Sequence, residues 1–288
     1  MKVDSTIQRE QFRQAKFIHG GLFKMGAAYL GIRLSRLPIP TERLRLWLYR
    51  EVFGKRYPPG VNEDEAEKPL SAYSSLNQFF TRGLKPECRP ILSGTSDFIC
   101  PCDGTVQDVG RVEDGKILTV KGVEYTLASL LPRTDLSDIE GGHFVIIFLS
   151  PIDCHRVFSP QDGSIDEVIH VPGSRLLVHP PCQRPEYPVY TLNERVILRF
   201  SNSMGPCVLV CVAGWGVGNI TLPIIPSFRT GSKRVSLALP IRVKRGDWVA
   251  TFELGSTVVL FAPPSSSAVS LVSPGEKVKY GQPLIGYS

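Results

Sequence analysis

The chain reads Phe252-Glu253-Leu254-Gly255-Ser256-Thr257-Val258-Val259-Leu260 near its C-terminus, an apolar run with a Gly-Ser pair inside it. As a structural feature, this pair predicts a glycine bulge in a core strand. As a chemical feature, it permits the Ser256 hydroxyl to attack the Gly255 carbonyl, because glycine has no side chain to block the approach and tolerates strained backbone geometry. Elimination from the resulting ester would cut the chain and convert Ser256 into a pyruvoyl group. From this stretch alone, both interpretations are open.

Around this stretch, the body of the chain has the composition of a β-rich fold. The 288 residues include 26 Gly and 24 Pro, and short apolar runs alternate with turn signals. Buried strands are expected over residues 145–149, 196–200 and 208–212, with turns at Asp103-Gly104, Asp114-Gly115, Asp162-Gly163 and Pro274-Gly275. The tail has the turn-strand-turn pattern of small hybrid barrels. We predict an α+β fold, in which a mostly-β domain of hybrid-barrel type with twisted, crossed sheets (61–288) follows a helical segment (1–60).

The predicted helical segment holds the positive charge of the chain. The net charge is +6, yet residues 1–56 carry twelve Lys and Arg against four Asp and Glu, and the rest is nearly neutral. Apolar residues recur at helical spacing, and Thr41 is placed to cap a helix with Leu44 and Trp47 on one face. A basic amphipathic segment is typical of helices in a lipid headgroup layer, so the expected partner is an anionic membrane surface. A helical hairpin packed on the body is the alternative.

Cysteine usage and hydropathy indicate in which cellular compartment the protein is expected. The seven cysteines are odd in number and include no Cys-x-x-Cys pair, which favours a reducing compartment, buried thiols and no metal site. No apolar stretch is long enough to span a bilayer, and the N-terminus lacks the apolar region of a signal peptide. We therefore expect a cytoplasmic protein.

Three residues far apart in sequence could form a nucleophilic site. Ser256 supplies a hydroxyl, His155 follows a predicted buried strand, and Asp103 precedes a glycine turn. A serine becomes nucleophilic when a base takes its proton, and the base needs an orienting carboxylate. These three side chains fill those roles if the fold brings them together. The alternative is that these residues have structural roles only, with Asp103 as a turn residue and His155 as a hydrogen-bonded residue at a strand end.

Seven segments extend these observations over the chain from about residue 25 to the end. They are Asn77-Gln78-Phe79-Phe80-Thr81-Arg82 with Arg89-Pro90-Ile91, Pro101-x-Asp103-Gly104, Lys121-Gly122-x-x-Tyr125-x-Leu127, Leu149-Ser150-Pro151-x-Asp153-x-His155-Arg156-Val157, Pro172-Gly173-Ser174, Asn193-Glu194-Arg195-Val196 and Leu254-Gly255-Ser256-Thr257. In this order and spacing, the set resembles the phosphatidylserine decarboxylases, the pyruvoyl-dependent enzymes of membrane lipid synthesis.

The resemblance implies a self-processing proenzyme. Ser256 would attack the Gly255 carbonyl, leaving a long chain (1–255) and a short partner chain (256–288) that begins with the pyruvoyl cofactor. Its ketone would form a Schiff base with the amine of phosphatidylserine and act as an electron sink as carbon dioxide leaves, which yields phosphatidylethanolamine. Asp103 matches the family's aspartate for self-cleavage. The resemblance further implies a homodimer. Since the sequence shows no transit peptide, we expect a bacterial protein, peripheral on the cytoplasmic side of the inner membrane, in preference to a mitochondrial one.

The histidine segment departs from the family pattern. The family reads His-x-x-His, whereas this chain reads His155-Arg156-Val157-Phe158. In the family the first histidine is tied to decarboxylation and the second to self-cleavage, and phenylalanine cannot accept a proton. Three explanations are open. His155 serves both steps, or His179 substitutes from a position where the family has Asn, or processing is slow or absent.

An unprocessed, membrane-surface lipid-binding relative is therefore the alternative to an active decarboxylase. A serine hydrolase is disfavoured because no Gly-x-Ser-x-Gly elbow surrounds any serine. Nucleic-acid binding is disfavoured because the basic N-terminal residues interleave with an apolar face and the body lacks a basic patch.

Overall fold

A computed structural model gives the fold of the protein. It describes residues 21–55, 57–91, 97–119, 122–132, 137–179, 187–215, 218–230, 235–253 and 255–287. Residues 1–20 of the predicted helical segment, Lys121 of one family segment, and Leu254 next to the Gly-Ser pair lie outside the described residues.

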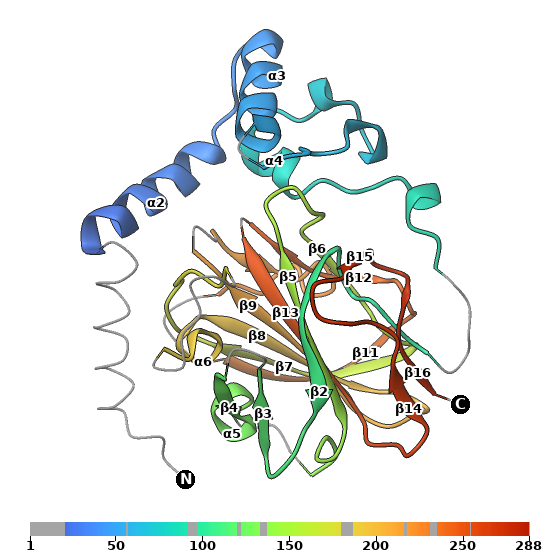
Figure 1. The fold of residues 1–288 in the computed structure, drawn as a ribbon. Coiled ribbons are helices and arrows are strands. Elements are labelled where there is room, and N and C mark those ends of the chain that lie inside the picture. Colours follow the sequence, from blue (N-terminus) through green and yellow to red (C-terminus); the bar gives the residue numbers. More distant parts are fainter. Residues whose placement is uncertain are drawn as a thin grey trace.

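The centre of the fold is an eight-stranded antiparallel sheet in the order β11-β7-β8-β9-β13-β5-β2-β15 (Figure 1). Its strands are β2 (Gly104–Arg111), β5 (His143–Leu149), β7 (Gly163–Val171), β8 (Arg195–Ser201), β9 (Cys207–Ala213), β11 (Val235–Val243), β13 (Ser256–Ala262) and β15 (Lys277–Val278). The buried strands predicted over residues 145–149, 196–200 and 208–212 are β5, β8 and β9, so these predictions are confirmed.

Three smaller sheets complete the β structure. One has the order β10-β12-β6 and a second the order β1-β16-β14, while β3 and β4 form a pair. Their strands are β1 (Phe98–Ile99), β3 (Lys116–Leu118), β4 (Glu124–Thr126), β6 (Arg156–Phe158), β10 (Ile220–Thr221), β12 (Trp248–Phe252), β14 (Ala268–Ser270) and β16 (Pro283–Tyr287). Two short helices, α5 (Leu127–Leu130) and α6 (Val189–Leu192), lie near the β3-β4 pair (Figure 1).

Strand β13 lies between β9 and β5, and all seven of its residues are buried. Because side chains alternate along a strand, β13 contributes to two cores on opposite faces of the large sheet. Val258 and Leu260 belong to a core shared with residues of β6, β12 and β16, which we call the β6-side core. Val259 and Phe261 belong to a core shared with α5 and α6, which we call the α5-side core.

The helices of the first ninety residues stand at one end of the sheet (Figure 1). They are α2 (Gly21–Ser35), α3 (Glu42–Arg50), the π-helical turn Glu51–Lys55, α4 (Leu76–Phe80) and short 3-10 turns at Glu63–Glu65, Leu70–Ala72 and Pro86–Cys88. The Thr41 side chain accepts a hydrogen bond from the Leu44 N–H, so the predicted N-cap of α3 is confirmed. A separate small core joins Tyr49 of α3 to Phe79 of α4, with their rings stacked at 4.7 Å between centroids.

The predicted mostly-β body with an N-terminal group of helices is confirmed. Among the described strands, no hydrogen-bonded pairing joins the edge strands β11 and β15, so the described part of the chain contains no closed barrel. No helix among the described residues is both long and apolar enough to cross a membrane.

Candidate active site

Ser256 is the first residue of β13, and its side chain is fully buried. It pairs with Leu149 of β5 on one side and Ala213 of β9 on the other. The preceding Gly255 has a φ of +43°, in the left-handed region that favours glycine. The Ser256 Oγ finds no hydrogen-bond partner among the described residues. Leaving a buried hydroxyl unpaired costs about 1–3 kcal/mol, so Ser256 at this position lowers the stability of the fold.

One backbone donor holds the carbonyl of Gly255. The Gly214 N–H donates to the Gly255 oxygen over 3.1 Å. A Cβ on Gly214 would lie 2.9 Å from that oxygen and 2.7 Å from a side-chain carbon of Val178, so the close approach requires glycine. This N–H is therefore aimed at the atom on which negative charge develops when a nucleophile adds to the Gly255 carbonyl.

His155 is fully buried and held in one orientation. Its Nδ1 lies 3.0 Å from the carbonyl oxygen of Asp153, and since a carbonyl only accepts, Nδ1 carries the proton. The Phe80 ring packs on the imidazole with 3.8 Å between centroids. Burial lowers the pKa of His155 to about 3, the Asp153 hydrogen bond opposes that shift, and the charge of Arg82 adds to it. The imidazole is thus neutral near pH 7, and its Nε2 lone pair has no partner among the described residues.

The pleat of β13 separates the two histidines that could act as base. By alternation, the Ser256 side chain lies on the face of Val258, toward the β6-side core. The carbonyl of His155, the residue before β6, accepts from the Phe252 N–H at the end of β12 over 3.0 Å. His155 therefore lies on the Ser256 side of the sheet. His179 is exposed and packs edge-on against Phe148, a residue of the α5-side core on the opposite face.

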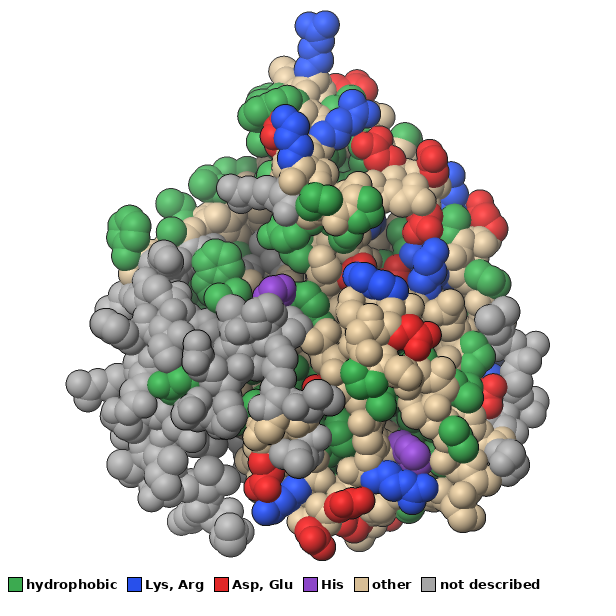
Figure 2. Space-filling model, in the orientation of Figure 1, with side chains coloured by type: hydrophobic (Ala, Val, Ile, Leu, Met, Phe, Trp, Pro, Cys, Tyr) green, Lys and Arg blue, Asp and Glu red, His purple; other side chains and the backbone are tan. Residues whose placement is uncertain are grey.

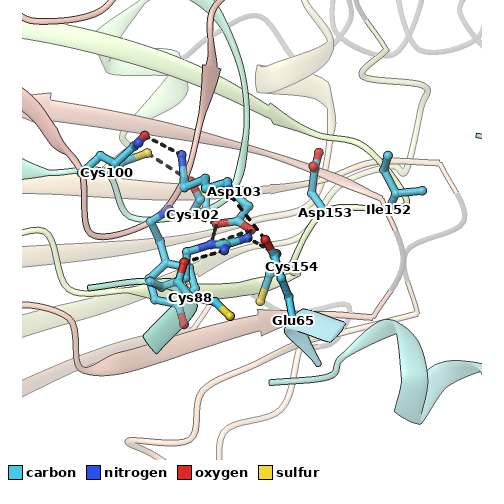
Figure 3. Close-up of polar contacts among 12 residues, drawn as sticks. Glu65, Cys88, Cys100, Cys102, Asp103, Ile152, Asp153 and Cys154 are labelled. Carbon is cyan, nitrogen blue, oxygen red and sulfur yellow. Dashed lines mark hydrogen bonds and ion pairs between the residues drawn. The ribbon is translucent and has the colours of Figure 1, made fainter. Parts of the chain in front are cut away.

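Asp103 is buried, and its carboxylate is held by an arginine (Figure 3). Arg89 donates to it from Nε at 3.0 and 3.2 Å and from Nη2 at 2.6 Å, and the Tyr280 N–H donates at 2.9 Å. Arg89 also donates to Glu65 over 2.8 Å. The expected carboxylate-imidazole contact is thus replaced in this structure by two separate arrangements, one of Asp103 with Arg89 and one of His155 with the Asp153 carbonyl.

Phe158 stands where the family resemblance expects a second imidazole. Its ring stacks on Tyr280 with 3.9 Å between centroids and 20° between planes, beside Leu84 and Cys154. Because the Tyr280 N–H binds Asp103, position 158 lies next to a residue that contacts that carboxylate. The stack contributes apolar packing and offers no proton acceptor.

The structure therefore brings Ser256 and His155 to one side of β13, places His179 on the other, and keeps Asp103 in an ion pair. Sequence reasoning quoted Arg89 inside a family segment but gave it no role, and it missed Gly214 and Tyr280. The signal for Gly214 was the glycine-rich run that follows β9, although a run of glycines does not say which carbonyl it approaches.

Comparison with known proteins identifies the family of this chain. Residues 76–286, well over half of the chain, match the family model described as phosphatidylserine decarboxylase. A phosphatidylserine decarboxylase proenzyme of Anaeromyxobacter sp. (strain K) is 33% identical over 259 residues, covering 87% of this chain and 89% of the relative. The proenzyme of Bordetella pertussis is 35% identical over 242 residues, covering 81% of each chain. That of Nitrosospira multiformis is 34% identical over 237 residues, covering 78% of this chain and 81% of the relative.

These matches define a class of lipid-metabolising enzymes, and the relatives of this chain within that class are named proenzymes. The chain belongs to the phosphatidylserine decarboxylase family.

Proposed function

We propose that this protein is a phosphatidylserine decarboxylase proenzyme that cuts itself between Gly255 and Ser256. The observation that carries the proposal is the fully buried Ser256 Oγ, which has no partner among the described residues and comes directly after a glycine in the left-handed region. Membership of the family supplies the reaction, and relatives that cover most of this chain are named proenzymes of it. The substrate is phosphatidylserine, and the product is phosphatidylethanolamine.

His155 is the base that we assign to the serine. Its imidazole is neutral, its Nδ1 is fixed by the Asp153 carbonyl, and its Nε2 has no partner among the described residues. The backbone bond of His155 to Phe252 puts this residue on the side of β13 to which the Ser256 side chain points. A general base typically contributes about a hundred- to ten-thousand-fold to the rate of proton transfer steps, and most when its pKa lies near the working pH. The proposal therefore gives His155 the self-cleavage role that a histidine at position 158 would fill in the family.

The self-cleavage proceeds by one bond exchange, one elimination and one hydrolysis. Nε2 of His155 takes the hydroxyl proton, Oγ of Ser256 bonds to the Gly255 carbonyl carbon, and the peptide C–N bond breaks to leave an ester and a free amine. The Gly214 N–H stabilises the oxyanion formed on the Gly255 oxygen. Elimination then removes the Cα proton of Ser256 and releases the Gly255 carboxylate, and hydrolysis of the remaining enamine releases ammonia and leaves a ketone.

The residues around position 256 fit a pyruvoyl group. The pairing of β13 with β5 and β9 continues beyond the cut, so the new N-terminus stays fixed between Leu149 and Ala213. A pyruvoyl group at this place supplies an electron sink for the loss of carbon dioxide. We assign Asp103 a positioning role, since its carboxylate fixes the Arg89 guanidinium and the Tyr280 backbone in one group.

Phe158 favours one alternative, an unprocessed relative that binds lipid at a membrane surface. A denaturing gel with intact-mass measurement separates the two functions. Self-cleavage predicts a large fragment ending at Gly255 and a small fragment of residues 256–288 whose first residue carries a carbonyl. A single chain of 31.8 kDa without that carbonyl would contradict the decarboxylase proposal and support the alternative.

The helices before residue 60 support a peripheral membrane placement for this enzyme. Exposed apolar side chains gather on α2 and α3, with Lys and Arg among them (Figure 2). Phe23 is 88% exposed, and Leu30 and Trp47 are each more than half exposed. Ile32 of α2 is buried instead, so the helix contacts the body on one side and presents apolar side chains on another. Such a surface suits an anionic lipid layer, which attracts the basic residues of the same segment.

Vesicle flotation tests this placement. The protein should float with vesicles that contain anionic lipid, and added salt should weaken the binding because it screens the basic residues. Phe23→Asp should lower the bound fraction about tenfold or more, since it removes an apolar side chain worth roughly 1.5–3 kcal/mol when buried. Val269→Asp is the matched control, because Val269 is an exposed apolar residue of the body. Equal loss in both variants, or binding without anionic lipid, would contradict the proposal.

A further inference from the structure

A cavity of about 430 Å³ lies where the helical segment meets the large sheet. Residues 57–60 line it on one side, and Ser150, Ile152 and Asp153 line it on the other. Asp103 and Gly104 at the start of β2 also contribute to its wall. Figure 3 shows Glu65, Asp103, Ile152 and Asp153 in this region. Self-cleavage as proposed above uses Asp103 only for positioning and gives the cavity itself no task.

Arg82 contributes to the wall of this cavity, and its guanidinium group is only partly paired by the described residues. Its side chain is 4% exposed, and its Nη2 donates to the Ile152 carbonyl over 2.7 Å. Its Nε and Nη1 have no hydrogen-bond partner among the described residues. The guanidinium packs over the Phe79 ring at 5.1 Å from the centroid. A buried cation with unpaired donors is costly unless something of opposite charge approaches it.

The charges that line the cavity leave an excess of one positive charge. Four cations contribute to the wall, namely Arg82, Arg89, Lys277 and Lys279. Three carboxylates face them, those of Glu65, Asp103 and Asp153.

Arg89 is committed to two of these carboxylates, those of Glu65 and Asp103, and Lys279 lies 3.3 Å from Glu65. Arg82 and Lys277 form no ion pair within 4.0 Å of a carboxylate among the described residues, and the Asp153 carboxylate acts electrostatically on both. These two cations and Asp153 together therefore carry the excess positive charge. A single negative charge would balance the wall.

We propose that this cavity binds a phosphate-type oxyanion between Arg82 and Lys277, and that the oxyanion is the phosphodiester of the lipid headgroup. A guanidinium offers paired donors that match phosphate oxygens, and a phosphodiester carries the one negative charge that the wall lacks. The assignment to a headgroup rests on the proposed function. Arg82 acts electrostatically on His155, and Ser150 follows the Leu149 that pairs with Ser256, so a headgroup held here has its amine within the same region of the sheet.

The test measures binding to the full-length Ser256→Ala chain, which stays uncut whatever the wild-type protein does. The probes are glycerophosphoserine, inorganic phosphate and free L-serine, each titrated by calorimetry at low salt. We expect the two phosphate compounds to bind and L-serine to bind at least tenfold more weakly. Tighter binding of glycerophosphoserine assigns the cavity to the lipid headgroup, and tighter binding of phosphate assigns it to the free anion. Failure of both phosphate compounds to bind would overturn the proposal.

Substitutions locate the binding. Arg82→Gln should weaken binding about tenfold or more, as expected for the loss of a charge-assisted hydrogen-bonded pair. Lys277→Gln should weaken it roughly two- to fivefold, which suits an exposed cation. Lys244→Gln removes the same charge from an exposed site outside the cavity and should leave binding unchanged. Thermal unfolding reports whether Arg82→Gln unfolds the chain. If it does, the proposal is tested by comparing the binding affinities of Lys277→Gln and Lys244→Gln. Equal effects of these two lysine variants would overturn the proposal.

The two proposals fail separately. A wild-type chain that is never cut, combined with a Ser256→Ala chain that binds glycerophosphoserine in an Arg82-dependent manner, would reject the enzyme and keep the oxyanion site. Conversely, the wild-type chain could be cut and decarboxylate lipid while substitutions at Arg82 and Lys277 leave glycerophosphoserine binding unchanged. That result would support the enzyme proposal and reject the oxyanion site.

Discussion

Ser256→Ala is expected to abolish self-cleavage and decarboxylation together, leaving one chain of 31.8 kDa with no carbonyl-bearing N-terminus. The physical reason is that the variant lacks the only atom that we assign to the attack, the Oγ next to the Gly255 carbonyl. The fold should survive, because the side chain is buried without a hydrogen-bond partner among the described residues and its removal leaves no donor or acceptor unpaired. Intact mass and a decarboxylation assay on the same preparation report both losses.

The adjacent Thr257 provides the matched control. It is also fully buried, its Oγ1 also lacks a partner among the described residues, and it points to the opposite face of β13. Thr257→Val removes that hydroxyl with almost no change in shape, and we expect normal cleavage and at least unchanged stability. If Ser256→Ala is still cut at the same bond, or if Thr257→Val blocks cleavage equally, the assignment of the nucleophile is wrong.

His155→Gln is expected to slow self-cleavage about a hundred- to ten-thousand-fold, the usual cost of losing a general base. Glutamine keeps a polar side chain of similar reach in the buried site but cannot take the hydroxyl proton. The measurement is the time course of fragment appearance after synthesis, followed on a denaturing gel. Decarboxylation per processed molecule, measured separately, shows whether the same imidazole also serves the lipid reaction.

His179→Gln tests the competing assignment. His179 is exposed and packs on Phe148, on the face of the sheet opposite to the Ser256 side chain. We therefore expect cleavage at the wild-type rate in this variant. A large loss in His179→Gln with little change in His155→Gln would transfer the role of base to His179.

Local pattern was enough to predict much of the fold. Short apolar runs bounded by turns predicted β5, β8 and β9, because their length and β-branched residues favour a buried strand over a helix. The Thr41 cap was predictable for a similar reason, since a capping hydroxyl and its N–H donor lie three residues apart. The expected barrel was not predictable in this way. Closure depends on how the edge strands β11 and β15 are placed, and no short segment contains both.

The candidate site also has features that the sequence predicted and features that required the tertiary structure. The sequence indicated Ser256, Gly255 and the absence of an imidazole at position 158, and it left two histidines as possible bases. Only the pleat of β13 distinguishes them, because the side on which a residue lies depends on strand register. The partners of Asp103 are also a tertiary matter, since the Tyr280 N–H that binds its carboxylate is 177 residues away.

By itself, therefore, the sequence determined the family, the strand that begins at Ser256 and the atom that we propose for the attack, because each of these is read from short motifs whose residues are neighbours in the chain. The tertiary structure decided which histidine shares a face with Ser256, that Arg89 holds Asp103, and that Arg82 contributes to the wall of a cavity while two of its donors have no partner among the described residues. Those properties depend on contacts between distant segments, and such contacts form only when burial of the two cores brings the segments together.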